Sequence, residues 1–411
     1  MNHLAGHEAR AEDFTGLRIG LATPAWPGTE TPNGIASAVA ALSAGLREIG
    51  HEVTILAHWL DAPHDDPHVI ALDKRPMSLA ERLLYRIQPD RANRSVMVAQ
   101  MIAAGRRAID ERGIEVLVME ESFGWAGELG RALPIPVVAT LHGPQWLHRT
   151  TPGRPTRGPS ARRESWEAAG LRLVDGIISP SRAVLEQTRA EWGLPDRPTA
   201  IIGNPVNLGA PFPPAAGTLA PHILFVGRFD RIKGADLVLD AFARIAEADP
   251  AARLTFVGPD EGLPQPDGST LHLPQALGSL PATVRDRISV LGRKTRAEVA
   301  ALRRHHPITL IASRYETFGV ALIEAMVAGS AVVATRVGGL AEILRDGETG
   351  FLVAPEDPQA LAEACLRLMH DPALAQRLGQ AARADVAARF SPQTIARELA
   401  AFLLPICRPR G

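Results

Sequence analysis

The residues HILFVGRFDRIKGADLVLDAFARIAEA (222–248) contain one complete unit of a strand, a loop and a helix. The apolar run 222–226 predicts a buried strand, and apolar residues recur with helical spacing over 235–248. Glycine and basic residues lie in the loop between them. Strands that are apolar throughout and alternate with helices are typical of a parallel sheet covered on both faces.

The same alternation continues on both sides of this unit. Before it, we predict strands at 17–23, 51–57, 116–119, 137–141 and 176–179, and helices at 35–49 and 95–112. After it, we predict strands at 253–257, 288–291, 309–312 and 331–334, and a helix at 320–328. The pattern predicts an α/β protein with two doubly wound, Rossmann-like domains.

A segment rich in proline and glycine, 201–221, separates the two series of strands and is typical of a linker. We expect a flexible N-terminus at 1–16, an N-terminal domain at 17–205, a linker at 206–221, a C-terminal domain at 222–389 and a terminal helix within 390–411 that packs back on the N-terminal domain. Two such domains place a ligand cleft between the carboxyl ends of their strands.

The composition narrows the class of protein. The chain has 411 residues, more than one ordinary core requires, and its 44 basic residues balance 45 acidic ones. Because this balance gives no electrostatic basis for nucleic-acid binding, we expect no nucleic-acid partner. Cys365 and Cys407 are the only cysteines, which indicates neither a disulfide framework nor a zinc site. The sequence contains no signal peptide and no membrane-spanning apolar run, so we expect a cytoplasmic protein.

The loop 227–234 is the first candidate site. It joins a strand end to a helix start, which is where α/β folds bind anions. Arg228 can hold a phosphate through two parallel hydrogen bonds, and Lys233 can add a compact charge. The alternative is a solvated basic loop without a ligand.

The segment ETFGVALIE (316–324) is the second candidate site. Glu324 is the only charged residue between the start of this segment and Arg336, and it lies in an apolar helix. A buried carboxylate requires polar partners, which ribose or sugar hydroxyls would supply. The alternative is an ion pair with Arg314 or Arg336, or capture by backbone amides. Gly319 opens the helix and lets its first amides approach an anion.

Polar residues also mark strand and helix ends in the first domain. Asn33 and Gly34 precede a helix, His142 ends a strand, and Glu120 and Glu121 follow another. These positions share the sheet edge that faces the predicted cleft. His142 is either catalytic or a structural hydrogen-bonding residue, and the two acids either contact an acceptor or are ordinary strand-end acids.

Five short sequence motifs taken together resemble those of a known family. They are G-R-x(4)-K at 227–233, E-x(7)-E at 316–324, Gly-Gly-x-x-Glu at 338–342, DGETGFLV at 346–353 and Ser-Pro-Ser at 179–181. In this order they are similar to the retaining glycosyltransferases of family four, which have the GT-B fold. The resemblance covers nearly the whole chain and is strongest over 222–353.

The resemblance implies an enzyme that moves a sugar from a nucleotide-sugar donor to an acceptor hydroxyl with retention of configuration. It implies that Arg228 and Lys233 hold the donor diphosphate, that Glu324 binds the ribose and that Glu316 binds the donor sugar. His142 matches a first-domain histidine near the anomeric centre. The expected catalytic residues are His142, Arg228, Lys233 and Glu316. The expected donor-binding residues are Gly34, Gly227, Arg228, Lys233, Gly258, Arg293, Lys294, Glu316, Phe318, Gly319, Val320, Ala321 and Glu324, and the acceptor-side residues are Asn33, Glu120 and His142.

The same resemblance implies that neither a metal nor a cofactor is needed. The sequence has no Asp-x-Asp pair, with which many metal-dependent glycosyltransferases hold a divalent ion. The donor would be a UDP-, GDP-, ADP- or TDP-sugar, and the acceptor a small molecule, a glycan or a lipid-linked compound. Asn33 departs from the family pattern, because many relatives have two adjacent glycines in this loop.

Several alternatives remain open. A pseudo-glycosyltransferase or a nucleotide-sugar epimerase could use the same fold, and a non-catalytic module could bind a sugar nucleotide. Analysis of products with and without an acceptor separates these functions. Arginines also flank apolar residues in the first domain, which we interpret as a solvated helical face, with peripheral membrane contact as the alternative. They are Arg82, Arg86, Arg91, Arg94, Arg106 and Arg107.

Overall fold

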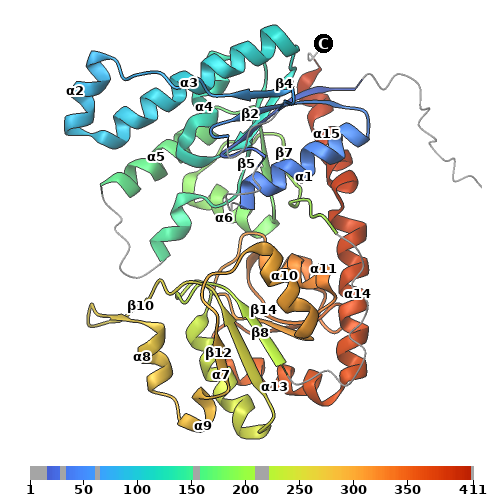
Figure 1. Cartoon of the computed structure of the whole chain (residues 1–411). Coiled ribbons are helices and arrows are strands. Elements are labelled where there is room, and N and C mark those ends of the chain that lie inside the picture. Colours follow the sequence, from blue (N-terminus) through green and yellow to red (C-terminus); the bar gives the residue numbers. More distant parts are fainter. Residues whose placement is uncertain (1–15, 28–33, 61–64, 151–157, 209–221, 409–411) are drawn as a thin grey trace, which may run out of the picture.

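The computed structural model describes residues 16–27, 34–60, 65–150, 158–208 and 222–408. It contains two parallel sheets with helices on their faces, one above the other in Figure 1. The predicted α/β class with two Rossmann-like sheets is confirmed. Among the described residues, no helix combines the length and the apolar character needed to cross a membrane.

The first sheet has seven strands in the order β3-β2-β1-β4-β5-β6-β7. They are β1 (Arg18–Thr23), β2 (Glu52–Ala57), β3 (Val69–Ala71), β4 (Val116–Glu120), β5 (Val137–Thr140), β6 (Gly176–Ser179) and β7 (Thr199–Ile201). Neighbouring strands run parallel, and in β1 and β2 every residue after the first is buried. Because both faces of these strands are covered, their buried residues are mostly apolar.

Helices cover both faces of this sheet. They are α1 (Gly34–Glu48), α2 (Leu79–Ile87), α3 (Pro89–Arg112), α4 (Trp125–Ala132), α5 (Pro159–Leu171) and α6 (Arg182–Trp192), with short 3-10 helices η1 (Ser122–Gly124) and η2 (Gln145–Thr150). The helix predicted at 95–112 begins earlier, at Pro89, because proline needs no amide donor in the first turn. Gly113 ends α3 at φ 62°, a conformation that favours glycine.

The second sheet has the order β12-β9-β8-β13-β14-β15. Its strands are β8 (His222–Val226), β9 (Arg253–Val257), β12 (Ile288–Val290), β13 (Ile308–Ile311), β14 (Ala331–Thr335) and β15 (Phe351–Val353), and a hairpin of β10 (Leu263–Pro264) and β11 (Thr270–Leu271) lies apart from it. The core between β8, β9 and the helix of residues Ala235–Ala248 contains the buried rings of Phe225, Phe242 and Phe256. Each such side chain contributes ~1.5–3 kcal/mol through burial.

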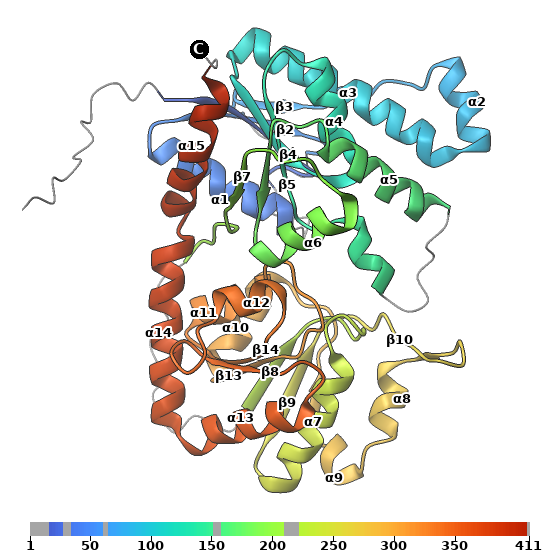
Figure 2. The same ribbon diagram turned by 180° about the vertical axis from the view of Figure 1, so that it is seen from behind.

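The helices of the second half pack on its sheet or on one another, and the last of them packs on the first domain. They are α7 (Ala235–Ala248), α8 (Leu273–Gly278), α9 (Ala282–Arg285), α10 (Arg296–His305), α11 (Val320–Ala328), α12 (Gly338–Ile343), α13 (Pro358–His370), α14 (Pro372–Phe390) and α15 (Pro392–Cys407). Figures 1 and 2 show α14 along the second domain and α15 against α1 of the first. Gly45 permits this approach, since a Cβ there would lie 2.2 Å from the carbonyl oxygen of Pro392. One apolar cluster continues through both domains and includes Ile19, Phe318 and Leu399.

A polar contact also joins the two domains. The hydroxyl of Ser181 caps α6 by accepting a hydrogen bond from the amide of Val184. From the other domain, Glu342 of α12 accepts hydrogen bonds from the amides of Arg182 and Ala183, each at 2.8 Å. Its carboxylate thereby satisfies free amides at the positive end of α6. The Ser-Pro-Ser and Gly-Gly-x-x-Glu motifs therefore contact each other at the domain interface.

Replacing Glu342 by Ala removes both acceptors from the start of α6. We expect the free energy of unfolding to fall by about 1 kcal/mol, as for the loss of a helix cap. Glu348→Ala is the matched control, because among the described residues the Glu348 side chain forms only an exposed ion pair with Arg345. Chemical denaturation measures both variants, and equal stabilities would contradict the role of Glu342.

Candidate functional site

The loop between β8 and α7 brings Arg228 and Lys233 to the carboxyl edge of the second sheet. Asp230 shapes this loop: its carboxylate accepts hydrogen bonds from the backbone amide of Lys233 at 2.7 Å and from Nε of Arg228 at 2.6 Å. The Lys233 ammonium lies 2.7 Å from Oε2 of Glu316, in the loop after β13. The side chain of Arg228 is 42% exposed and that of Lys233 26%, so a ligand can reach both cations.

Glycines let the strand ends approach each other closely around this loop. A Cβ on Gly258, whose φ is 151°, would lie 1.9 Å from the carbonyl oxygen of Gly227. A Cβ on Gly234, which starts α7 at φ 64°, would lie 1.9 Å from the carbonyl oxygen of Ala312. The loops after β8, β9 and β13 are therefore packed backbone against backbone, which places their side chains on one edge.

The backbone around Glu316 is held by the glycine pair that begins α12. The amide of Gly339 donates a hydrogen bond to the carbonyl of Glu316 at 3.0 Å, and a Cβ on Gly338 would lie 2.1 Å from that same oxygen. The Ser313 hydroxyl donates to Oε2 of Glu316 at 3.2 Å. Gly319, at φ 98°, then starts α11 without a side-chain cap. Its first amides lack intrahelical acceptors and are available to an anion.

Glu324 has a different partner from those predicted. Its Oε2 lies 3.3 Å from Nη2 of Arg303, on α10, whereas Arg314 pairs with Asp236 and Arg336 with Asp346. The ion pair predicted as an alternative is therefore present, but the proposed arginines were wrong. The Glu324 side chain is 34% exposed and the Arg303 side chain only 2%. The buried guanidinium of Arg303 thus forms an ion pair with the Glu324 carboxylate, which remains partly exposed.

Glu324 and Arg303 line a pocket between the two domains. Its second-domain wall comes from α10 and α11, and its first-domain wall from the start of α1 and the segment after β7. Gly34 and Asn204 belong to this first-domain wall. Nε and Nη1 of Arg303 are buried and have no hydrogen-bond partner in the described part of the chain. This leaves donors beside Glu324 that a ligand or water can satisfy.

The His142 loop is anchored by two buried carboxylates. Glu121 accepts hydrogen bonds from the amides of His142 at 3.0 Å and of Gly143 at 2.8 Å. Glu167 accepts a further bond from the amide of Gln145 at 2.7 Å. Burial, together with the nearby Glu167 charge, raises the pKa of Glu121 to about 7. Glu121 is therefore a positioning residue for His142, a role that its strand-end position alone did not indicate.

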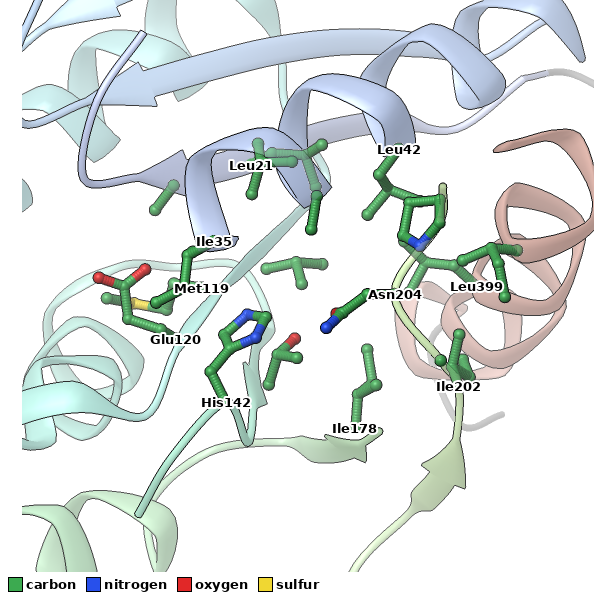
Figure 3. Close-up of a pocket in the computed structure, with 18 residues that line it drawn as sticks. Leu21, Ile35, Leu42, Met119, Glu120, His142, Ile178, Ile202, Asn204 and Leu399 are labelled. Atoms are coloured by element: carbon green, nitrogen blue, oxygen red, sulfur yellow. The ribbon is translucent and has the colours of Figure 1, made fainter. Parts of the chain in front are cut away.

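His142 and Glu120 border an apolar pocket under α1 and α15. Figure 3 shows the His142 ring and the Asn204 amide turned into this pocket, with Glu120 at one edge. Burial lowers the pKa of His142 to about 4, which keeps the imidazole neutral at neutral pH. Burial raises the pKa of Glu120 to about 7, and its Oε2 has no hydrogen-bond partner among the described residues.

An aromatic contact brings the two halves of the site together. The rings of Trp146, in η2, and Tyr315, next to Glu316, lie 6.1 Å apart in an edge-to-face arrangement. The His142 loop and the Glu316 loop therefore meet across the cleft. Asn204 lines both the pocket that contains His142 and the pocket that contains Glu324.

The remaining predicted residues differ in accessibility. Val320 is 41% exposed at the start of α11, next to Ala321, while the ring of Phe318 is buried against Phe390, so Phe318 could offer a ligand only its backbone. Arg293 and Lys294 are exposed after β12, and Lys294 pairs with Glu298 at 3.0 Å. Asn33 lies outside the described residues.

Comparison with known proteins assigns the family. Residues 214–385 match the family described as glycosyl transferases group 1, and residues 32–210 match glycosyltransferase family 4. The chain belongs to these glycosyltransferases. Each half of the fold thus matches a glycosyltransferase family, and the family expected from the sequence is confirmed.

Two curated relatives of the chain are named for different activities. The glycosyltransferase is 31% identical to D-inositol 3-phosphate glycosyltransferase of Streptomyces bingchenggensis, over 65% of the chain and 60% of the relative. It is 29% identical to glycogen synthase of Mycobacterium tuberculosis, over 65% of the chain and 63% of the relative. The chain thus spans less than two thirds of the length of either relative.

Solved structures share the whole fold. Sucrose-phosphate synthase from Thermosynechococcus elongatus is 25% identical with a TM-score of 0.70, over 95% of this chain and 99% of that chain. HepE of Anabaena, solved with UDP-glucose, is 18% identical with a TM-score of 0.67, over 95% of this chain and 100% of that chain. The GT-B fold expected from the resemblance is confirmed.

The protonation of Glu120 gives a pH-dependent prediction. Its folded-state pKa of about 7 lies above the ordinary 4.5, so the folded protein keeps a proton that the unfolded chain releases. This stabilisation is fully present below the unfolded pKa and is lost as the pH rises through 7. We therefore expect the stability of the wild type relative to Glu120→Gln to fall by a few kcal/mol at most between pH 5 and pH 8. Thermal unfolding across this range measures the difference, and parallel profiles would contradict it.

Proposed function

We propose that this glycosyltransferase is a retaining, metal-independent enzyme that transfers a sugar from a nucleotide sugar to an acceptor hydroxyl. The observation that carries the proposal is the grouping of Lys233, Arg228 and the uncapped start of α11 beside Glu316. Two accessible cations and a helix N-terminus form a site for a diphosphate. An adjacent carboxylate can accept hydrogen bonds from sugar hydroxyls.

The departing diphosphate carries the charge that develops during transfer. Lys233 and Arg228 would neutralise it, and Asp230 and Glu316 now hold these cations in place. Positive charge fixed before the reaction stabilises the transition state without reorganisation. Because these protein groups supply the positive charge, the chemistry requires no divalent ion on the diphosphate, which supports metal independence.

Glu316 and Glu324 would bind different parts of the donor. Glu316 pairs with Lys233, which would bind the diphosphate, and this supports a contact between Glu316 and the transferred sugar. Glu324 lies further along α11 in the interdomain pocket and would receive the ribose hydroxyls. Arg303 would act as a positioning residue that keeps the Glu324 carboxylate ionised and oriented.

The first domain would present the acceptor to the anomeric carbon. His142 is neutral and lies in a loop that contacts the Glu316 loop through Trp146 and Tyr315, so it can donate one hydrogen bond to a sugar or acceptor oxygen. The bond from the anomeric carbon to the diphosphate breaks as the acceptor oxygen bonds on the same face. The acceptor proton passes to the departing phosphate oxygen, so retention requires no separate protein base.

The solved relatives suggest which nucleotide sugars to test first as donors. HepE of Anabaena was solved with UDP and with UDP-glucose. We therefore take UDP-sugars as the first donors to test, with GDP-, ADP- and TDP-sugars as alternatives. The acceptor would be a small molecule, a glycan or a lipid-linked compound, since one curated relative is named for D-inositol 3-phosphate and another for glycogen.

Release of a nucleoside diphosphate from these donors, with and without candidate acceptors, tests the function. We expect acceptor-dependent release that EDTA does not abolish, and a glycoside product whose anomeric configuration matches the donor by NMR. Glu316→Gln should lower kcat at least tenfold, since it removes a charged partner of the sugar and of Lys233. Glu247→Gln, on the exposed end of α7, is the matched control.

Different outcomes overturn different parts of this proposal. An inverted product would contradict retention, and loss of activity in EDTA that Mg²⁺ restores would contradict metal independence. Conversion of the donor without any acceptor would favour an epimerase. An unchanged rate for Glu316→Gln would contradict the assigned sugar contact.

A further inference from the structure

α2 carries a stripe of large apolar side chains on its water-facing side. Leu79 is 79% exposed, Leu83 62% and Ile87 78%. Residues spaced four apart lie on one face of a helix, so the three form one continuous stripe. In an ordinary amphipathic helix this face would be polar and the apolar face would be buried. Such an exposed stripe marks an interaction surface.

The exposure does not result from a frayed helix. Ser78 caps α2 through a complete capping box with Glu81. Figures 1 and 2 show α2 folded back along α3 at the outer edge of the first domain, away from the second domain. The opposite face, which includes the buried Glu81, packs inward. The stripe is therefore presented on a fixed element.

Among the described residues, the exposed charged side chains of α2 are all basic. Arg82 and Arg86 lie on the exposed surface one residue before Leu83 and Ile87, respectively, and Arg91 is exposed just beyond the helix. In the described part of the chain, none of the three forms an ion pair with a carboxylate. The surface thus combines an apolar stripe with unneutralised positive charge.

The acidic residues of the same segment are turned away and neutralised. Glu81 is held by Arg75 at 2.6 Å, and Asp90 by Arg162 at 2.7 Å. The guanidinium of Arg75 keeps the pKa of Glu81 well below its usual range. These pairs remove negative charge from the exposed face of α2, which leaves that face cationic.

A second exposed pair adjoins α2. The side chain of Trp59 is 54% exposed, and the Lys74 ammonium lies 4.3 Å from the centroid of its ring. Lys74 directly precedes Arg75, which is bound to α2 through Glu81. Tryptophan and lysine are residues that favour the boundary between lipid and water.

We propose that the exposed face of α2 docks on the surface of an anionic lipid bilayer. Leu79, Leu83 and Ile87 would enter the interface between headgroups and acyl chains, and Arg82 and Arg86 would contact lipid phosphates. A second copy of the chain fits less well, because a symmetric contact would bring the arginines of one α2 against those of the other. The proposal takes up the peripheral membrane contact that the sequence left open as the alternative to a solvated helical face.

Vesicle co-sedimentation of the full chain tests the proposal. We expect the wild type to sediment with phosphatidylcholine vesicles that contain phosphatidylglycerol, to remain in solution with phosphatidylcholine alone, and to dissociate as NaCl is raised. Leu79→Ser/Leu83→Ser/Ile87→Ser should lower the partition coefficient at least tenfold. Arg82→Glu/Arg86→Glu should lower it more than tenfold, since each arginine near an anionic surface contributes about fivefold.

The matched control is Val290→Ser/Leu291→Ser, which removes exposed apolar side chains from the second domain. It should bind vesicles as the wild type does. The proposal is overturned if the wild type never sediments, if either α2 variant sediments like the wild type, or if the control loses binding equally. Light scattering that shows a dimer dissociated by the α2 variants would assign the face to a second copy instead. The salt dependence of the wild type requires no variant, so the test does not depend on variant folding.

Discussion

The contact between the Lys233 ammonium and Glu316, at 2.7 Å, joins two loops whose residues lie 83 positions apart in the sequence. It depends on the parallel sheet, because only parallel strands bring the ends of β8 and β13 to the same edge. It also depends on glycine at Gly234 and Gly338, where a side chain would collide with backbone. A diphosphate that enters this edge would share Lys233 with Glu316 and leave the carboxylate free for a sugar hydroxyl. In the structure the charges of Lys233 and Arg228 are balanced by Glu316 and Asp230.

Buried carboxylates also hold the His142 loop of the first domain in place. Glu121 and Glu167 bind backbone amides of the His142 loop, so these buried acids fix a loop rather than react. Glu342 does the same for the start of α6 from the opposite domain, and α15 ties the chain end to α1. Carboxylates that accept amide hydrogen bonds set the geometry of the cleft at three places. A rearrangement of the domains would have to exchange the two hydrogen bonds of Glu342, which cross between the domains, for bonds to water or ligand.

The sequence predicts those features that depend on local pattern. The strand of 222–226, its basic loop and the glycine-opened helix after Glu316 are each continuous in the chain, so periodicity and glycine placement identify them. The partner of Glu324 was not predictable in this way, because Arg303 lies on another helix and reaches it only through the packing of α10 on α11. Asp230 carried a signal, since it lies between Arg228 and Lys233, but Glu167 carried none. The orientation of Leu79, Leu83 and Ile87 also required the structure, because spacing defines a stripe without showing whether it faces protein or solvent.

Calorimetric binding of a nucleoside diphosphate tests the central claim most directly. The ligand is whichever of UDP, GDP, ADP and TDP raises the thermal midpoint of the wild type most. The account predicts that Lys233→Ala weakens its affinity by ~1.5–3 kcal/mol, the cost of a lost charge-assisted hydrogen bond. Lys74→Ala, which removes the same charge beside Trp59 in the first domain, should leave the affinity unchanged. An unaltered affinity for Lys233→Ala, or an equal loss in both variants, would contradict a diphosphate site at the Lys233–Glu316 edge.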